Sequence, residues 1–215
     1  MKKRIYALIL GGIFAFAGCP LTSIAQTAST AEPTTVTKGK PYKENWANTK
    51  VILKKKIWTV EDKNNDNNTW EDLDAGAPAY NGANATVNAD DWLVSPPLHL
   101  IAGQTYALEA GAVVGGHSGT GQRMNIAYGT GDDPTTYNEI VPTTPISGTA
   151  FGTPTTIKTT FTPTETGDYR IGFHAVSDRP GYIIMRPVKV EEAAETSGTP
   201  IAISDLKLET GQNGE

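Results

Sequence analysis

The chain has 215 residues, with 18 Lys and Arg against 23 Asp and Glu, so its formal net charge at pH 7 is −5. This acidic balance argues against nucleic acid and against an anionic membrane as partners. The length allows one ordinary domain with a targeting segment, or at most two small domains. The single cysteine, Cys19, lies so near the N-terminus that the rest of the chain has no disulfide, cysteine nucleophile or thiolate metal site.

Residues 1–25 have the pattern of a secretory signal peptide. Three basic residues precede an apolar run over 5–17, which is shorter than the ~20 residues of a membrane-spanning helix. We therefore expect an exported protein that is secreted or attached to the cell surface, with no transmembrane segment.

Two processing routes for this signal remain open. The small-x-small sequence that ends at Ala25 predicts cleavage after that residue. The sequence 16–19 looks like a lipobox, in which Cys19 would be acylated and anchor the protein. Pro20 and Phe16 are unusual for a lipobox, so cleavage after Ala25 is favoured.

Residues 26–40 are rich in Thr, Ala, Ser and Pro and are predicted to form a flexible linker. The folded domain is expected over 41–209, followed by a polar tail over 210–215.

Within that domain, apolar residues alternate with polar ones, as in strands with one buried face. The runs begin at Tyr106, Met124, Tyr169 and Ile201. Residues 51–60 and 181–190 are further strand candidates, and Pro187 favours an edge position for the second. Many Gly and Pro residues lie between the runs, which favours an all-β sandwich, jelly roll included.

No catalytic residue is indicated. His99, His117 and His174 lack the spacing of paired metal ligands, and neither a His-Glu-x-x-His nor a Gly-x-Ser-x-Gly motif is present. Glu109 interrupts an apolar run, but its position in the alternation faces solvent, and no pair of carboxylates stands out as a glycosidase would require.

Two acidic segments predict a metal site. Asp62, Asn64 and Asp66 place side-chain oxygens at alternate positions, as in a calcium loop. The glycine and the closing glutamate of an EF-hand are absent, although asparagine at 67 or 68 can make the turn. Asp90 and Asp91 are adjacent and would repel each other without a cation or hydrogen-bond donors between them. A polar surface turn is the alternative interpretation of the first segment.

The tryptophans Trp58, Trp70 and Trp92 are expected in the core beside this loop. A sugar-stacking platform is the alternative role for an aromatic ring, and Trp46 and Tyr80 are the candidates for it because their surroundings are polar and rich in turns.

The segments 58–70 and 89–98, together with 103–106, 128–131, 169–175 and 203–208, resemble in their order the cleaved-adhesin modules of Bacteroidetes surface proteins, such as gingipain haemagglutinin regions. The resemblance spans about residues 41–209, and Asn67 stands where the family has glycine. It implies a jelly-roll sandwich, calcium held by the Asp62 loop and by Asp90 and Asp91, and surface adhesion through a glycan or host protein.

The leading hypothesis is therefore a non-catalytic adhesion or carbohydrate-binding module that is stabilised by calcium. The alternatives are a small hydrolase or accessory domain of a glycan-degrading system, which would have a pocket with converging titratable groups, and a structural spacer, which would have no sizeable pocket or aromatic platform.

Overall fold

The computed structural model describes residues 28–72, 76–115, 122–147, 153–178 and 181–194. The signal peptide, Cys19, the candidate strand at Ile201, His117 and the polar tail lie outside these ranges. Within them, no helix is long and apolar enough to cross a membrane.

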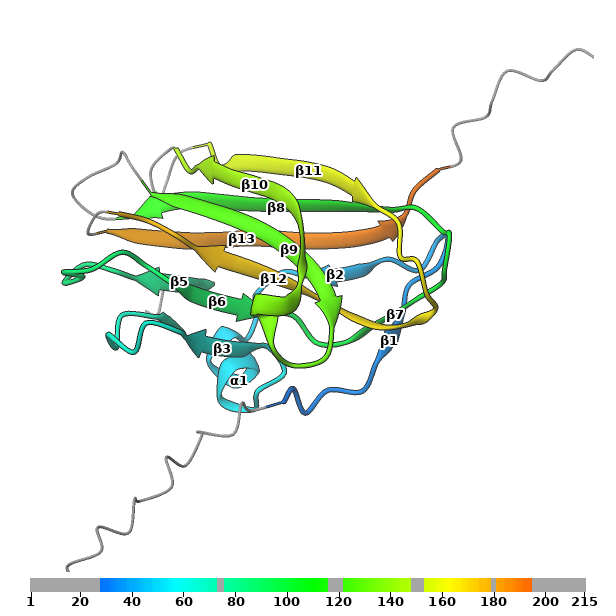
Figure 1. Ribbon diagram of the computed structural model, residues 1–215, viewed down its shortest axis with the longest axis horizontal. Helices are drawn as coiled ribbons and strands as arrows, with labels where there is room; N and C mark the ends of the chain where they lie inside the picture. The colour runs from blue at the N-terminus through cyan, green and yellow to red at the C-terminus, as the bar shows by residue number, and fades with distance from the viewer. Residues whose placement is uncertain (1–27, 73–75, 116–121, 148–152, 179–180, 195–215) are drawn as a thin grey trace, which may run out of the picture.

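Two β-sheets pack face to face as a sandwich (Figure 1). The seven-stranded sheet contains β1 (Thr34–Thr35), β3 (Thr59–Asp62), β6 (Asp91–Val94), β7 (Leu98–Leu100), β9 (Arg123–Thr130), β10 (Asn138–Pro145) and β12 (Gly167–Ala175). The six-stranded sheet contains β2 (Tyr42–Glu44), β4 (Trp70–Asp72), β5 (Pro78–Asn81), β8 (Tyr106–Gly115), β11 (Thr155–Phe161) and β13 (Tyr182–Glu192). The all-β sandwich predicted from the alternating runs is confirmed.

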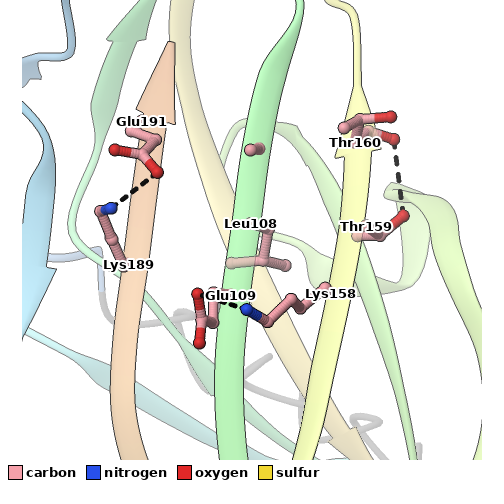
Figure 2. Close-up of a pocket in the computed structure, with 8 residues that line it drawn as sticks. Leu108, Glu109, Lys158, Thr159, Thr160, Lys189 and Glu191 are labelled. Atoms are coloured by element: carbon pink, nitrogen blue, oxygen red, sulfur yellow. Dashed lines mark hydrogen bonds and ion pairs between the residues drawn. The ribbon is translucent and has the colours of Figure 1, made fainter. Parts of the chain in front are cut away.

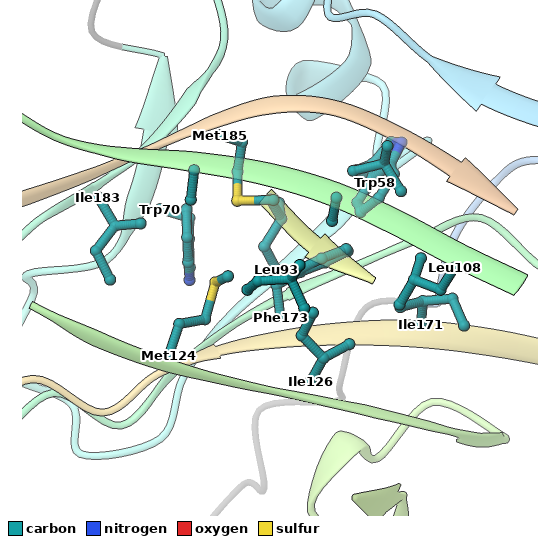
Figure 3. Packing of buried hydrophobic residues seen from close by; sticks show 14 of the residues in the cluster. Trp58, Trp70, Leu93, Leu108, Met124, Ile126, Ile171, Phe173, Ile183 and Met185 are labelled. Carbon is teal, nitrogen blue, oxygen red and sulfur yellow. The ribbon is translucent and has the colours of Figure 1, made fainter. Parts of the chain in front are cut away.

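The core fills the space between the sheets (Figure 3). The alternation predicted from the sequence holds in β8, where Leu108 and Ala110 point inward and Glu109 is exposed. Large side chains from both sheets meet there: Trp58, Trp70, Leu93, Met124, Phe173 and Met185. Trp92 is the exception among the three tryptophans expected in this core, because it packs with Val94 and Ala127 in a separate cluster.

The segment 26–40 does not behave as a free linker where it is described. β1 pairs in parallel with β7, and Val36 is buried in the core. The backbone N–H of Val36 also donates to the carbonyl of His99 (3.4 Å). The sequence did not predict this contact, because a two-residue strand is too short to show an alternation of apolar and polar residues.

The strand candidate at 51–60 is wrong in its first half. Residues Thr49–Lys54 form the short helix α1, with Ile52 on its buried side, and only Thr59–Asp62 pair as β3. A run of β-branched and leucine residues can form a buried turn of helix as well as a strand. This run is too short for its periodicity to distinguish the two.

Pro187 does not place its strand at an edge. β13 is central and pairs with β8 along one side, and with β5 and then β2 along the other. The register shifts between Met185 and Val188, so Pro187 lies in a bulge, where a missing N–H removes no ladder hydrogen bond.

Candidate metal centre

The loop between β3 and β4 is a tight polar turn held by its own side chains. The Asp62 carboxylate accepts hydrogen bonds from the backbone N–H of Asn67 (2.9 Å) and of Asp66 (3.3 Å). Asn67 has φ of 64°, a left-handed conformation that asparagine adopts more readily than most residues. The turn at the position of the family's glycine is therefore made by Asn67.

Asp91 lies opposite Asp62 in the β3–β6 pair and is 0% exposed. One carboxylate oxygen, Oδ2, accepts from the Asp90 N–H (3.2 Å), while Oδ1 is buried without a hydrogen-bond partner. Burial is the main cause that raises the pKa of Asp91 to about 7, and the charges of Asp62 and Asp66 act in the same direction. The Asp90 N–H and the nearby Thr69 hydroxyl, which itself makes no hydrogen bond within bonding distance to a described residue, act to lower it. An ionised Asp91 is thus costly here unless a positive charge accompanies it.

Asp66 contributes a second oxygen of this kind. Its Oδ1 accepts from the N–H of Asn68 (2.8 Å), but its Oδ2 is buried without a donor. Buried carboxylate oxygens in proteins are generally satisfied by a hydrogen-bond donor, a water molecule or a cation. Asp62, Asp66 and Asp91 offer only oxygen donors, which are the ligands that Ca²⁺ prefers.

The residues therefore fit a hard cation in chemistry. They do not yet form a finished coordination shell, because no three His, Cys, Asp or Glu side chains in the described part of the chain converge as a metal-binding group. A cation would have to draw the carboxylates together and take further oxygens from the backbone or from water.

Tyr80 borders this acidic cluster from β5 and is a correction to its predicted role. It is 1% exposed and meets Trp70 edge to face at 6.1 Å. Burial and then the charges of Asp91 and Asp66 raise the pKa of Tyr80 well above its ordinary value, so the phenol stays neutral. The ring is a wall of the cluster and offers no surface on which a sugar could stack.

Trp46 is likewise buried, at 2% exposure, and is not a stacking platform. Its indole N–H donates to the Arg186 carbonyl (2.9 Å), and its ring lies 4.8 Å from that of Trp58.

Asp90 is directed to the opposite face of the seven-stranded sheet. Its carboxylate contacts His174 Nε2 at 2.7 Å, and the His174 ring stacks on Trp92 at 4.0 Å. Burial lowers the pKa of His174, so the imidazole is mostly neutral at pH 7. This face was expected to be solvated, but His174 is covered by its neighbours.

The five predicted ligands thus separate into three groups. Asp62, Asp66 and Asp91 come together, whereas Asp90 belongs to the His174 contact. Asn64 braces the loop: its side-chain nitrogen donates to the carbonyl of Asn88 (2.7 Å), and its oxygen accepts from the Asp66 N–H (3.2 Å). The sequence did not reveal Tyr80 as part of the cluster, although its place opposite Trp70 in the β4–β5 pair follows once the strands are known.

A second feature lies on the outer face of the six-stranded sheet (Figure 2). A groove of about 530 Å³ crosses β11, β8 and β13, and we call it the β8 groove. The residues that line it include Ala107, Glu109, Lys158, Thr160, Lys189 and Glu191.

Comparison with solved structures identifies the architecture. The K1 cleaved-adhesin domain of Lys-gingipain from Porphyromonas gingivalis W83 superposes with a TM-score of 0.55 at 18% identity, over 72% of this chain and 99% of that domain. The K2 domain of the same protease gives a TM-score of 0.55 at 12% identity, over 73% and 100%. The chain has the cleaved-adhesin fold.

This result confirms the jelly-roll sandwich that the resemblance implied. A weaker likeness, with a TM-score of 0.47 at 16% identity, extends to a CBM4 structure over 63% of this chain and 86% of that one. No protein-family model matches the sequence, and no curated protein matches it. The cleaved-adhesin fold alone does not assign a ligand or a metal.

Proposed function

We propose that the chain is a non-catalytic adhesion module with a structural calcium ion held by Asp62, Asp66 and Asp91. The observation that carries the metal is the pair of buried carboxylate oxygens, Asp66 Oδ2 and Asp91 Oδ1, that no donor satisfies. Calcium would supply the missing positive charge and tie the β3–β4 loop to β6.

The burial of the same cluster favours a structural role over a catalytic one. A general acid or base must reach the proton that it transfers, and Asp91 and Tyr80, whose pKa values are the most raised within the cluster, are 0% and 1% exposed. The hydrolase alternative would need converging titratable groups that open into a pocket. The titratable groups of the β8 groove are instead engaged with one another in two Lys–Glu ion pairs.

The adhesion role is supported by the fold and by the β8 groove together. Two structures with this fold are named as cleaved-adhesin domains. The groove gives the sandwich a depression of about 530 Å³ bordered by charged side chains, in the size range of ligand sites, which a plain spacer would not need. The partner would be a glycan or a host or matrix protein, and the acidic chain gives no reason to expect nucleic acid.

Thermal unfolding tests the metal. At free calcium about a hundredfold above Kd, binding to the folded state alone adds about 2.7 kcal/mol, which raises the melting temperature of a domain of this size by roughly 5–10 °C. An equal midpoint in calcium and in EDTA would remove the metal from the proposal. Magnesium serves as the control, because it prefers a smaller and more regular shell.

Binding of the full chain to immobilised glycans and matrix proteins, measured in calcium, tests adhesion. Retention on at least one surface that excess soluble ligand abolishes is the expected result. Absence of binding to both classes would contradict the adhesion role.

Export and anchoring are part of the same proposal. Residues 1–25 would direct the chain out of the cytoplasm, with either cleavage after Ala25 or acylation of Cys19. Radiolabelled palmitate separates the two: label that a Cys19→Ala variant loses demonstrates a lipid anchor, and an unlabelled, secreted protein demonstrates cleavage after Ala25.

A further inference from the structure

The β8 groove is built from side chains that the strand register fixes in a row. Lys158 on β11 and Lys189 on β13 both pair with Glu109 on β8, so the three side chains stand side by side on the outer face (Figure 2). The next outward position repeats the arrangement with Thr160, Ala107 and Glu191.

Ala107 explains why the face is hollow at this point. Its neighbours across the strands, Thr160 and Glu191, have longer side chains, whereas the methyl group of Ala107 fills little space above β8. The floor is rigid because β8 is hydrogen-bonded to a strand on each side. A depression in a fixed sheet is a preorganised binding surface, which lowers the entropy cost of binding.

The charges that border the depression are already balanced in pairs. Lys158 Nζ lies 3.2 Å from Glu109 Oε2, and Lys189 Nζ lies 2.6 Å from Glu191 Oε1. A charged ligand would either have to break these ion pairs or lie beside a side chain of its own charge: an anion beside a glutamate, or a cation beside a lysine. A neutral ligand with many hydroxyls can use the remaining ammonium protons and carboxylate lone pairs without breaking them.

We propose that the β8 groove binds a neutral, polyhydroxylated chain, that is, a segment of an uncharged oligosaccharide. This inference rests on the proposed adhesion function and assigns its ligand class and binding face. Hydroxyl groups of adjacent sugars would hydrogen-bond to the two Lys–Glu pairs and to Thr160, and one sugar ring would sit over the Ala107 methyl group. Among the described residues, none of those that line this groove is aromatic, so hydrogen bonds and shape would carry the affinity.

Titration calorimetry with uncharged gluco-, manno-, galacto- and xylo-oligosaccharides, in calcium, tests this inference. We expect at least one series to bind, with affinity that changes less than about twofold between roughly 50 mM and 500 mM NaCl, because no net charge is neutralised. The substitution Ala107→Phe should weaken that binding at least about tenfold, because it fills the floor and leaves every polar group in place.

The matched control is Thr156→Phe, which places the same ring on the exposed side of β11 outside the groove. It should change the affinity less than about twofold, and equal melting temperatures of the two variants show that both are folded. Equal binding by wild type and Ala107→Phe would contradict the β8 groove as the binding site, but would leave the adhesion function unaffected. Binding only to sulfated glycans or to proteins would overturn the ligand class, and binding to none of these would overturn the adhesion function itself.

Discussion

Asp62 and Asp91 lie directly opposite each other in the antiparallel pair of β3 and β6, so two acidic residues form one cross-strand pair. Like charges in directly opposed positions destabilise a strand pair. The third carboxylate, Asp66, adds its charge to the same cluster. Under the proposal made above, a bound cation would offset this repulsion, so we expect the stability of the sandwich to respond to calcium.

The substitution Asp66→Asn should remove most of the stabilisation by calcium. It deletes one of the two unsatisfied carboxylate charges but keeps the shape of the side chain and the oxygen that accepts from Asn68. We expect the rise in melting temperature on adding calcium to fall to less than half of the wild-type value. Asp168→Asn, at an exposed carboxylate that pairs with His99, is the control and should keep the full rise.

The raised pKa of Asp91 predicts a specific pH dependence in calcium-free buffer. The ordinary pKa is 3.8, and the folded value is about 7. Between these values the folded protein holds a proton that the unfolded chain has lost, so the contribution of this group to stability is present below about pH 4 and declines as the pH rises to about 7. At 1.36 kcal/mol per pKa unit, the loss over this whole range is about 4 kcal/mol.

Urea unfolding at pH 5 and at pH 7.5 measures this effect against Asp91→Asn, which cannot titrate. Without calcium, the unfolding free energy of the wild type should fall relative to that of Asp91→Asn as the pH rises. With saturating calcium the trend should reverse, because the metal requires the ionised carboxylate. A difference that is constant across this range would contradict the raised pKa.

Trp70 connects the core to the acidic cluster through its indole N–H, which donates to the carbonyl of Asp91 (3.1 Å). Trp70→Phe should cost about 1–3 kcal/mol, because a buried carbonyl loses its donor, and should also weaken calcium binding. Trp46→Phe removes the equivalent bond to Arg186 away from the cluster. It should show a similar loss of stability with unchanged calcium affinity.

The outer face of the seven-stranded sheet requires glycine at position 172. A Cβ atom there would lie 2.8 Å from Trp92 Cε3 and 3.4 Å from Tyr137 Cδ2. Gly172→Ala should therefore destabilise the protein by about 1–3 kcal/mol. Trp92→Leu should suppress that loss, with a coupling of about 1 kcal/mol or more in a double-mutant cycle. Additive effects would show that the two positions do not compete for space.

The strands that carry the sandwich could be predicted because their apolar residues alternate over many positions. β8, β9 and β12 follow the runs at Tyr106, Met124 and Tyr169. β1 and α1 escaped prediction because a few residues carry no measurable period. The edge position predicted from Pro187 was wrong because the proline lies in a bulge of a central strand. A bulge depends on how β13 pairs with its neighbour, which the local sequence does not reveal.

The acidic cluster was predicted in part for the same reason. Asp62 ends β3 and Asp66 follows four residues later in the same turn, so their proximity follows from their spacing in the sequence. The inward position of Asp91 follows from its phase with Leu93 along β6. Adjacent residues in a strand point to opposite faces, so Asp90 could not share the site with Asp91. The burial of Trp46 and Tyr80 depends on tertiary contacts, with Arg186 and Trp58 for Trp46 and with Trp70 for Tyr80, which composition alone does not reveal.

The melting temperature of Asp91→Asn relative to wild type, measured with calcium and with EDTA, tests the proposed cation site most directly. The amide keeps the shape, removes the buried charge and adds a donor. We predict that the variant melts above wild type in EDTA and below it in calcium, by several degrees in each case. A difference of the same sign in both conditions would contradict a cation held by Asp62, Asp66 and Asp91.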